Sequence, residues 1–445
     1  MSQRLKNDTA MQQRPRTACC PRLLACCALV LLAAATAGLL YGQAALPSSE
    51  VVPVVDGVVL VDDEESGQPA PYSETTLPDG TRVVSYEWVM LVDPEQRQIL
   101  AAQAPDLMQY LRTSRRFSLM AGELLTFSIP PDLDEGEAVR QLVPENLRDR
   151  FDRNHVYAPN SRNDEPGKSA AGIRGPVPDL RQPFAAVCDM PLTVGMIDSW
   201  IDTTHPAFAR FTDPAKRLVN RNFVDTSLPL AKAHGTAVAA LLLGRHESGG
   251  RRLLAPLVPE ARVLNAAVFH TVPGREEGAP VSRVLAGLDW LAQQDGVRAI
   301  NMSLAGPPNR VLAQAVTALA QRELLIVAAV GNDGPFGPER YPAAYVDAVG
   351  VAATRNNGEI YRWSNQGEHV DFAALGAGIF SAGAEHDFVE QSGTSLAAPV
   401  VTAFLACRMG EGLSARAALA ALGDEALDLG EPGRDKVYGR GLLHP

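Results

Sequence analysis

From about residue 184 to the C-terminus, short apolar runs alternate with helical stretches, and this alternation constrains the fold more than any other feature. The apolar runs are of strand length and nearly free of charge: "LTVGMID", "RVLNAAVF", "AINMSLA", "LLIVAAVGN" and "DAVGVAA". The stretches "VSRVLAGLDWLAQQ" and "NRVLAQAVTALAQRE" have helical spacing. Such a pattern predicts an α/β fold with a doubly wound, mainly parallel sheet that carries helices on both faces. In sheets of this kind, ligands bind beyond the carboxyl ends of the strands.

Four further segments precede this domain, which we place at residues 184–445. A small α+β unit is expected at 81–157, because "RVVSYEWVMLV" and "ELLTFSIP" alternate like strands and "EGEAVRQLVPENLRDRF" has helical spacing. The remaining segments are a basic n-region with a signal peptide or signal anchor at 1–45, an acidic and Pro-rich tether at 46–80 that includes a candidate strand at 51–61, and a polar linker open to proteolysis at 158–183.

The N-terminal leader determines where the protein is expected to act. Residues Leu23–Leu40 contain no charge and follow a basic run, which is the layout of a secretory signal or of an uncleaved anchor. Both alternatives predict export to a periplasmic or extracellular compartment, and membrane contact only through this leader. The formal net charge of −11 argues against nucleic acid as a partner.

Two cysteines, Cys188 and Cys407, lie outside the leader. Export makes a disulfide between them chemically possible, but two buried free thiols are the plainer expectation. The sequence contains no Cys-x-x-Cys pair and no His-Glu-x-x-His run, so we expect neither a metal site nor a required cofactor.

Three residues carry reactive groups at positions where a site is expected. Asp198 ends an apolar run, and His234 and Ser395 each stand where a helical stretch begins. Each is a common structural residue when taken alone. Together they supply a nucleophile, a base to take its proton, and a carboxylate to orient the base. Asn332 follows the run "LLIVAAV" and could donate a hydrogen bond to an oxyanion, although a turn asparagine is the simpler interpretation when it is considered alone.

The segments around these residues resemble the subtilisin family of serine proteases. The blocks occur in the family's order: "VGMIDSWIDTTHP", "HGTAVAA", "INMSLAGP", "AAVGNDGP", "YPAAY", "WSNQGEHVDFAALG" and "GTSLAAP". The resemblance implies a serine endopeptidase with Asp198, His234 and Ser395 as its triad and Asn332 in its oxyanion hole. It also implies that protein or peptide substrates contact a pocket formed by residues 303–305 and 328–330, which includes Ser303, Leu304, Ala305 and Ala329.

Further expectations follow from the resemblance. The end of the unit at 81–157, "LVPENLRDRFDRNHVYAP", resembles the last helix and strand of the family's inhibitory and chaperoning propeptides. The protein's own propeptide therefore becomes an expected partner, and self-cleavage is expected between about Asn160 and Pro183. Arg340 falls at the floor of the substrate pocket, where it would favour an acidic side chain unless it points to solvent. Members of the family often bind structural calcium, but no Asp-x-Asp-x-Asp-Gly loop supports such a site here.

Two alternatives to a secreted zymogen stay open at this stage. Trp200 stands where the family usually has glycine, two residues after Asp198, and a bulky ring there is compatible with a catalytically silent binding protein. Retention of the leader would instead give a membrane-anchored processing protease with a narrow range of substrates.

Overall fold

The computed structural model describes residues 59–60, 73–159, 180 and 182–445. The leader at 1–45, nearly all of the predicted linker and most of the predicted tether lie outside the described residues. Within the described part of the chain, no helix is long and apolar enough to cross a membrane.

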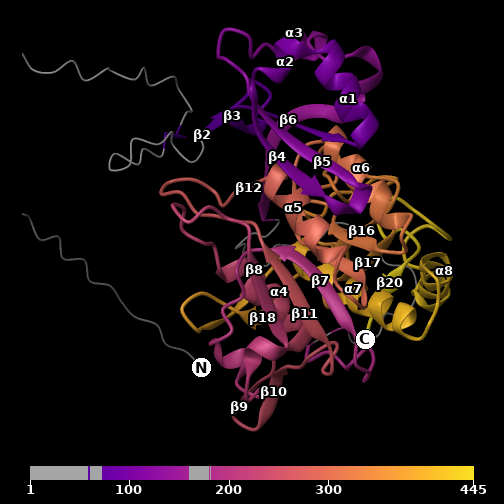
Figure 1. Cartoon of the computed structure of the whole chain (residues 1–445). Helices are drawn as coiled ribbons and strands as arrows, with labels where there is room; N and C mark the ends of the chain where they lie inside the picture. Colours follow the sequence, from indigo (N-terminus) through magenta and orange to yellow (C-terminus); the bar gives the residue numbers. More distant parts are fainter. Residues whose placement is uncertain (1–58, 61–72, 160–179, 181) are drawn as a thin grey trace, which may run out of the picture. The chain divides into compact units, whose positions relative to one another are not determined.

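The larger unit is built on a parallel sheet of eight strands in the order β20-β17-β16-β15-β13-β7-β11-β8 (Figure 1). All of its strand pairs are parallel, as the apolar runs predict. The chain enters at β7, crosses to β8 at one edge, returns to β11 between the two, and then continues outward on the other side of β7. The strands are β7 (Thr193–Asp198), β8 (Leu218–Asn222), β11 (Arg262–Ala267), β13 (Val297–Met302), β15 (Leu325–Ala329), β16 (Ala348–Thr354), β17 (Phe372–Leu375) and β20 (Leu442–Leu443).

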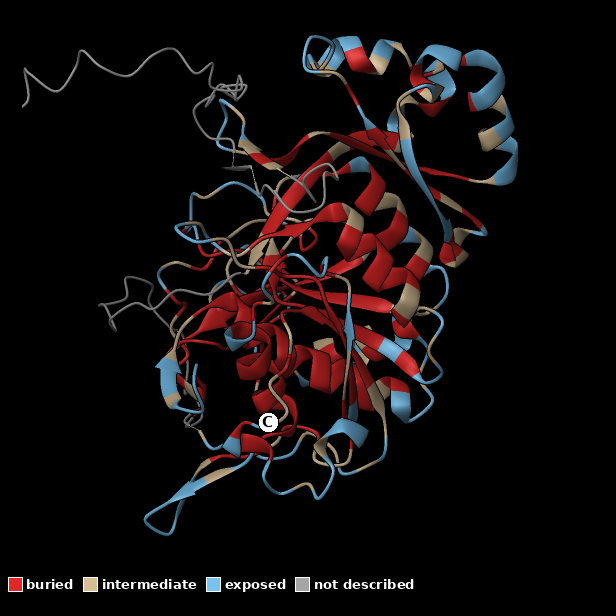
Figure 2. Cartoon of the chain, turned by 60° about the vertical axis from the view of Figure 1, so that its left-hand side comes forward, coloured by how far each residue is buried: buried red, intermediate tan, exposed pale blue. Residues whose placement is uncertain are grey.

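The helices of this unit form two packed groups. Helix α5 contacts α6, while α7 contacts both α4 and α8, and the strands between them are almost wholly buried (Figure 2). The two helices expected from sequence are confirmed as α5 and α6. The helices are α4 (Ala233–Leu243), α5 (Val281–Leu291), α6 (Arg310–Ala320), α7 (Thr394–Gly410) and α8 (Ala415–Glu425). Short strands complete the unit: β9 (His246–Ser248), β10 (Arg251–Leu254), β12 (Ala279–Pro280), β14 (Leu304–Ala305), β18 (Ile379–Ala382) and β19 (Phe388–Gln391).

Residues 59–60 and 73–159 form an antiparallel sheet with helices, which we call the N-terminal unit. Its sheet begins before the expected boundary at residue 81, because β2 lies within the predicted tether and pairs with β3. The strands are β1 (Val59–Leu60), β2 (Ser73–Thr76), β3 (Arg82–Val92), β4 (Leu111–Phe117), β5 (Gly122–Ser128) and β6 (Phe151–Pro159), and the helices are α1 (Pro94–Gln103), α2 (Pro105–Met108) and α3 (Gly136–Gln141).

The predicted helix over residues 135–151 is shorter than expected. Helix α3 ends at Gln141, and a 3-10 helix follows at Glu145–Arg150. Pro144 lies between the two, and proline has no N–H with which to continue the helical hydrogen bonds. The break therefore has a local cause that is visible in the sequence.

Both faces of the N-terminal sheet are buried at β3, whose successive side chains point to opposite faces. Val89 and Leu91 join the main core against the larger unit, whereas Trp88 and Met90 point to a second core with α1–α3. The N-terminal unit therefore rests on the larger unit through an apolar face rather than through polar contacts alone.

The two body cysteines form a disulfide, so the expectation of free thiols is wrong. Cys188 and Cys407 are 219 residues apart in sequence. Cys188 precedes β7, and Cys407 lies in the last part of α7. The fold brings these two segments together, which no spacing in the sequence could reveal.

Candidate active site

Asp198 and His234 meet at the carboxyl end of the central strand. Asp198 is the last residue of β7, and its Oδ1 lies 2.7 Å from His234 Nδ1. Since a carboxylate can only accept, Nδ1 must carry the proton, and Nε2 of the neutral ring is left as a base. Burial by itself lowers the pKa of His234, but the charge of Asp198 and its hydrogen bond outweigh burial and raise the pKa above its usual value.

Close approach of α4 to the end of β7 makes this contact possible. His234 is the second residue of α4, and the next residue is Gly235. A Cβ at position 235 would collide with the Ser199 carbonyl, while the Gly235 N–H donates to Ser199 Oγ at 2.7 Å. Glycine is therefore required for the helix to lie near enough to bring His234 to Asp198.

Ser395 stands at the second position of α7, where backbone N–H groups have no acceptor within the helix. Four residues later, Pro399 has no N–H to give to the Ser395 carbonyl. The Ser303 hydroxyl replaces it and donates to that carbonyl at 2.7 Å. Ser303 thus fixes the backbone of the candidate nucleophile.

The two atoms that would exchange a proton are both buried and both unpaired among the described residues. His234 Nε2 and Ser395 Oγ have no hydrogen-bond partner, and α4 packs against α7. A buried polar atom without a partner costs stability, so unpaired groups of this kind commonly mark function. Catalytic hydrogen bonds are often long until a substrate is bound.

Asn332 is held by the residue that precedes Ser395. Its Oδ1 accepts from the Thr394 N–H at 3.1 Å and lies 3.3 Å from Thr394 Oγ1. Because the oxygen of the amide faces Thr394, the amide nitrogen is directed elsewhere as a donor. Asn332 follows β15, and Gly331 before it has a φ of +119°, which turns the chain at the strand end.

The last strand of the N-terminal unit lies between two short strands of the larger unit. Strand β6 pairs antiparallel with β12 on one side, where Tyr157 faces Ala279, and with β14 on the other, where Ala158 faces Ala305. The Tyr157 hydroxyl donates to the Pro307 carbonyl at 2.8 Å, and a Cβ on Gly306 would collide with the Tyr157 ring. The tyrosine therefore fills a fitted apolar recess.

A cavity of about 540 Å³ opens beside this strand, and its lining combines three predicted site residues, Ala305, Asn332 and Arg340, with the strand end at Pro159. The other predicted pocket residues, Ser303, Leu304 and Ala329, are fully buried and are not among the residues that line it.

Arg340 neither points freely to solvent nor carries an isolated charge. Its Nε and Nη2 lie 2.7 and 2.9 Å from the two Asp333 carboxylate oxygens, and one third of its side chain is exposed. This bidentate ion pair offsets the positive charge of Arg340. The expected preference for acidic substrate side chains depends on that charge.

A family model of the subtilases, the peptidase S8 family, matches residues 191–441. The chain belongs to the subtilase family. Its members are serine-type endopeptidases, and the α/β fold with a parallel sheet is the fold of the family.

Individual relatives each match about half of this subtilase. The minor extracellular protease Epr of Bacillus subtilis is 31% identical over 214 residues, which are 47% of this chain and 32% of Epr. The major intracellular serine protease of the same organism is 29% identical over 228 residues, 48% of this chain and 67% of that protein. Subtilisin DY of Bacillus licheniformis is 30% identical over 261 residues, 56% of this chain and 88% of subtilisin DY. The chain thus spans between 32% and 88% of the length of these relatives.

Sequence reasoning passed over three residues that the subtilase brings to this region. Thr394 orients Asn332, Tyr157 anchors β6, and Glu277 lies in the loop before β12. Thr394 adjoins the predicted nucleophile and could have been found there. The other two carry no local signal, since their roles depend on pairing between distant strands.

Proposed function

We propose that the protein is a serine endopeptidase that hydrolyses peptide bonds through an acyl-enzyme intermediate on Ser395. The observation that carries this proposal is the oriented pair of Asp198 and His234, which leaves Nε2 as an unpaired buried base on a helix packed against the helix of Ser395. Membership of the subtilase family supports the same reaction.

In the proposed reaction, His234 Nε2 takes the Ser395 proton as Oγ attacks the carbonyl carbon of the substrate. The imidazolium that forms is stabilised by the Asp198 carboxylate. His234 then gives the proton to the leaving amine, so that the acyl group remains on Oγ. Water, activated by the same imidazole, finally releases the acyl group and restores the serine.

The negative charge that develops on the carbonyl oxygen needs donors already in place. We assign the Asn332 amide and the Ser395 N–H to this role, the latter helped by the positive end of α7. Replacing Asn332 by alanine is expected to lower kcat about 10²–10³-fold with little change in KM, which is the loss known for an oxyanion-hole asparagine of subtilisin itself. Steady-state hydrolysis of a peptide substrate measures this. The exposed Asn356 provides a control (N356A), and equal kcat values for N332A and the unchanged protein would exclude the assignment.

We further propose that the N-terminal unit is an inhibitory propeptide and that the enzyme cuts itself after β6. Pro159, the last residue of β6, pairs with Leu304, which directly follows Ser303 in the chain. The Ser303 hydroxyl donates a hydrogen bond to the Ser395 carbonyl. The bond after Asn160 is therefore the first candidate, within the expected range that ends at Pro183. N-terminal sequencing of the mature form should give a start between residues 161 and 183, and a start upstream of Pro159 contradicts self-cleavage at this cleft.

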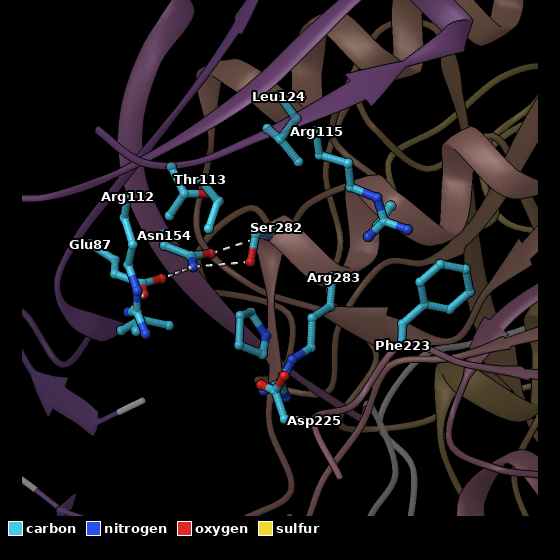
Figure 3. A pocket seen from close by; sticks show the side chains of 14 residues that line it. Glu87, Arg112, Thr113, Arg115, Leu124, Asn154, Phe223, Asp225, Ser282 and Arg283 are labelled. Carbon is cyan, nitrogen blue, oxygen red and sulfur yellow. Dashed lines mark hydrogen bonds and ion pairs between the residues drawn. The ribbon is translucent and has the colours of Figure 1, made fainter. Parts of the chain in front are cut away.

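Side chains of β6 also accept hydrogen bonds from backbone N–H groups at the starts of two helices, which supports a role in assembling the larger unit. Asp152 Oδ2 accepts from the Arg310 N–H at the start of α6, and Asn154 Oδ1 accepts from the Ser282 N–H at the start of α5. Figure 3 shows Asn154 also bonded to Glu87, beside a cavity between the N-terminal sheet and α5. Helix N-termini need such acceptors, so the strand would favour the docking of both helices during folding.

Through His155, binding of the proposed propeptide to the larger unit is expected to depend on pH. Burial lowers its pKa, against the opposing charge of Asp152, and its Nδ1 accepts a hydrogen bond from the Asn309 amide at 2.8 Å. The pKa of this histidine is lower in the complex than its free value of about 6.5, so protonation weakens binding of the N-terminal unit. The contribution of the neutral histidine to binding is complete above that value and is lost as the pH falls below it. The buried carboxyls Asp152 and Glu87 have raised pKa values and act in the opposite sense at lower pH.

After self-cleavage, activity is therefore expected to appear faster at pH 5.5 than at pH 7.5, by at most tenfold per pH unit for a single proton. The matched variant His155→Gln cannot charge and should show a flatter dependence. The measurement is the rate at which peptidase activity appears after the chain has been cut. An identical pH dependence in His155→Gln would rule out His155 as the group responsible.

We propose export for this protein, because of the leader and because Epr, a relative, is named an extracellular protease. Anchoring by residues 23–40 remains an alternative to cleavage of the leader. The mass of the mature protein distinguishes the two outcomes.

A further inference from the structure

A carboxylate that the mechanism does not use lies beside the candidate triad. Glu277 is the second-last residue of the loop that leads into β12, and its Oε2 is buried with no hydrogen-bond partner among the described residues. Its backbone, in contrast, is well held, since the Glu277 carbonyl accepts from Arg82 Nη1 at 3.2 Å. The loop is therefore fixed at its backbone, while no ion pair to the Glu277 carboxylate is found in the part of the chain that the structure describes.

The position of Glu277 is set by the strand pairing in the cleft. Strand β12 pairs antiparallel with β6, with Ala279 facing Tyr157 and Pro280 facing Val156. The same register, continued by two residues, puts Glu277 opposite Pro159. Paired residues of antiparallel strands direct their side chains to the same face. A peptide that replaces β6 would thus present the side chain at the Pro159 position to Glu277.

The charges around Glu277 agree with a place next to the triad. Burial raises its pKa, the charge of His234 lowers it, and the charge of Asp198 raises it further. His234 in turn has its pKa raised in part by Glu277. Glu277 is thus a second carboxylate that raises the pKa of the His234 imidazole. The residue that the strand register puts opposite it, Pro159, carries no charge.

We propose that Glu277 is a specificity-determining residue that favours lysine or arginine as the second residue before the scissile bond. This inference rests on the proposed peptidase function and on cleavage after Asn160, which makes Pro159 that second residue. A cationic side chain there would pair with the carboxylate, as proline cannot. Arg82 belongs to the N-terminal unit and would leave with it, together with Glu74, its ion-pair partner at 2.9 Å in the same unit.

The test uses the self-processed enzyme and quenched fluorescent peptides based on residues 155–162, "HVYAPNSR", with the proline replaced by lysine, alanine or glutamate. The expected kcat/KM is about tenfold higher for lysine than for alanine, and lower for glutamate, as suits one charged hydrogen bond. In Glu277→Gln the lysine and alanine peptides should become nearly equal, while Glu277→Asp should keep part of the preference. High salt should reduce the ratio in the unchanged enzyme.

The exposed Glu390 in β19 supplies the matched control for loss of one negative charge, since Glu390→Gln should keep the full lysine preference. Equal labelling of all variants by a fluorophosphonate probe shows that each is folded and active. Equal hydrolysis of the lysine and alanine peptides by the unchanged enzyme overturns the inference and leaves the proposed function intact. A preference that survives in Glu277→Gln also overturns it. Hydrolysis of none of the peptides, together with no labelling, rejects the proposed function itself.

Discussion

Replacing Ser395 by alanine is expected to abolish peptide hydrolysis, with kcat falling about 10⁶-fold, and to leave the protein as one uncut chain. The methyl group has no proton to give to His234 and no oxygen to carry the acyl group, so only transition-state binding by the remaining groups is left. Peptide hydrolysis and the mass of the purified protein measure the two effects. The pairing of β6 with β12 and β14 should persist, since it involves the backbone and not the serine hydroxyl.

A serine close to the candidate nucleophile provides the control for this experiment. Ser392 lies three residues before Ser395, and its Oγ accepts from the exposed Gly378 N–H at 3.0 Å. Ser392→Ala should therefore process and hydrolyse peptides much as the unchanged protein does. A Ser395→Ala protein with the unchanged distribution of sizes would show that another protease, or none, cuts the linker.

Replacing Asp198 by asparagine is expected to lower kcat about 10⁴-fold while leaving the fold intact. An amide of the same shape can donate to Nδ1, which would stabilise the wrong tautomer of His234 and leave Nε2 protonated. It also carries no charge to stabilise the imidazolium. Since Asp198 raises the pKa of His234, the acidic limb of kcat/KM should move to lower pH in the variant.

The pH profile separates this role from a merely structural one. Asp202, four residues later, accepts hydrogen bonds from Thr204 at a more exposed position, and Asp202→Asn should leave the acidic limb where it is. A full loss of activity in Asp198→Asn with an unfolded circular dichroism spectrum would indicate a structural role. A folded Asp198→Asn protein with normal kcat would contradict the orienting role of the carboxylate.

The sequence alone could predict the elements that carry the site, because their signals are local. Apolar runs without charge become the central strands, and Asp198 and Asn332 follow from standing at or just beyond the ends of two of them. His234 and Ser395 stand at helix starts, but their proposed roles rest on the combination of the three residue types and on the resemblance to the subtilisin family rather than on these positions alone. Each of these placements depends on a few neighbouring residues and on the rule that parallel strands end at one edge.

Contacts between distant segments could not be predicted in this way. The pairing of Arg340 with Asp333 depends on a loop that folds back on itself, and the disulfide depends on where α7 ends. The place of Glu277 depends on the register between β12 and β6, which are more than a hundred residues apart. Hydrophobic periodicity specifies which side of a strand is buried, but not which partner it meets.

Labelling of the self-processed protein with a fluorophosphonate probe tests the central claim most directly, because the probe reacts only with a serine activated by a neighbouring base. We predict one label per molecule, located on the peptide that contains Ser395, and lost both in Ser395→Ala and after heat denaturation. A protein that is folded and cut but takes up no label, or takes it up on another serine, would contradict the proposal that His234 activates Ser395.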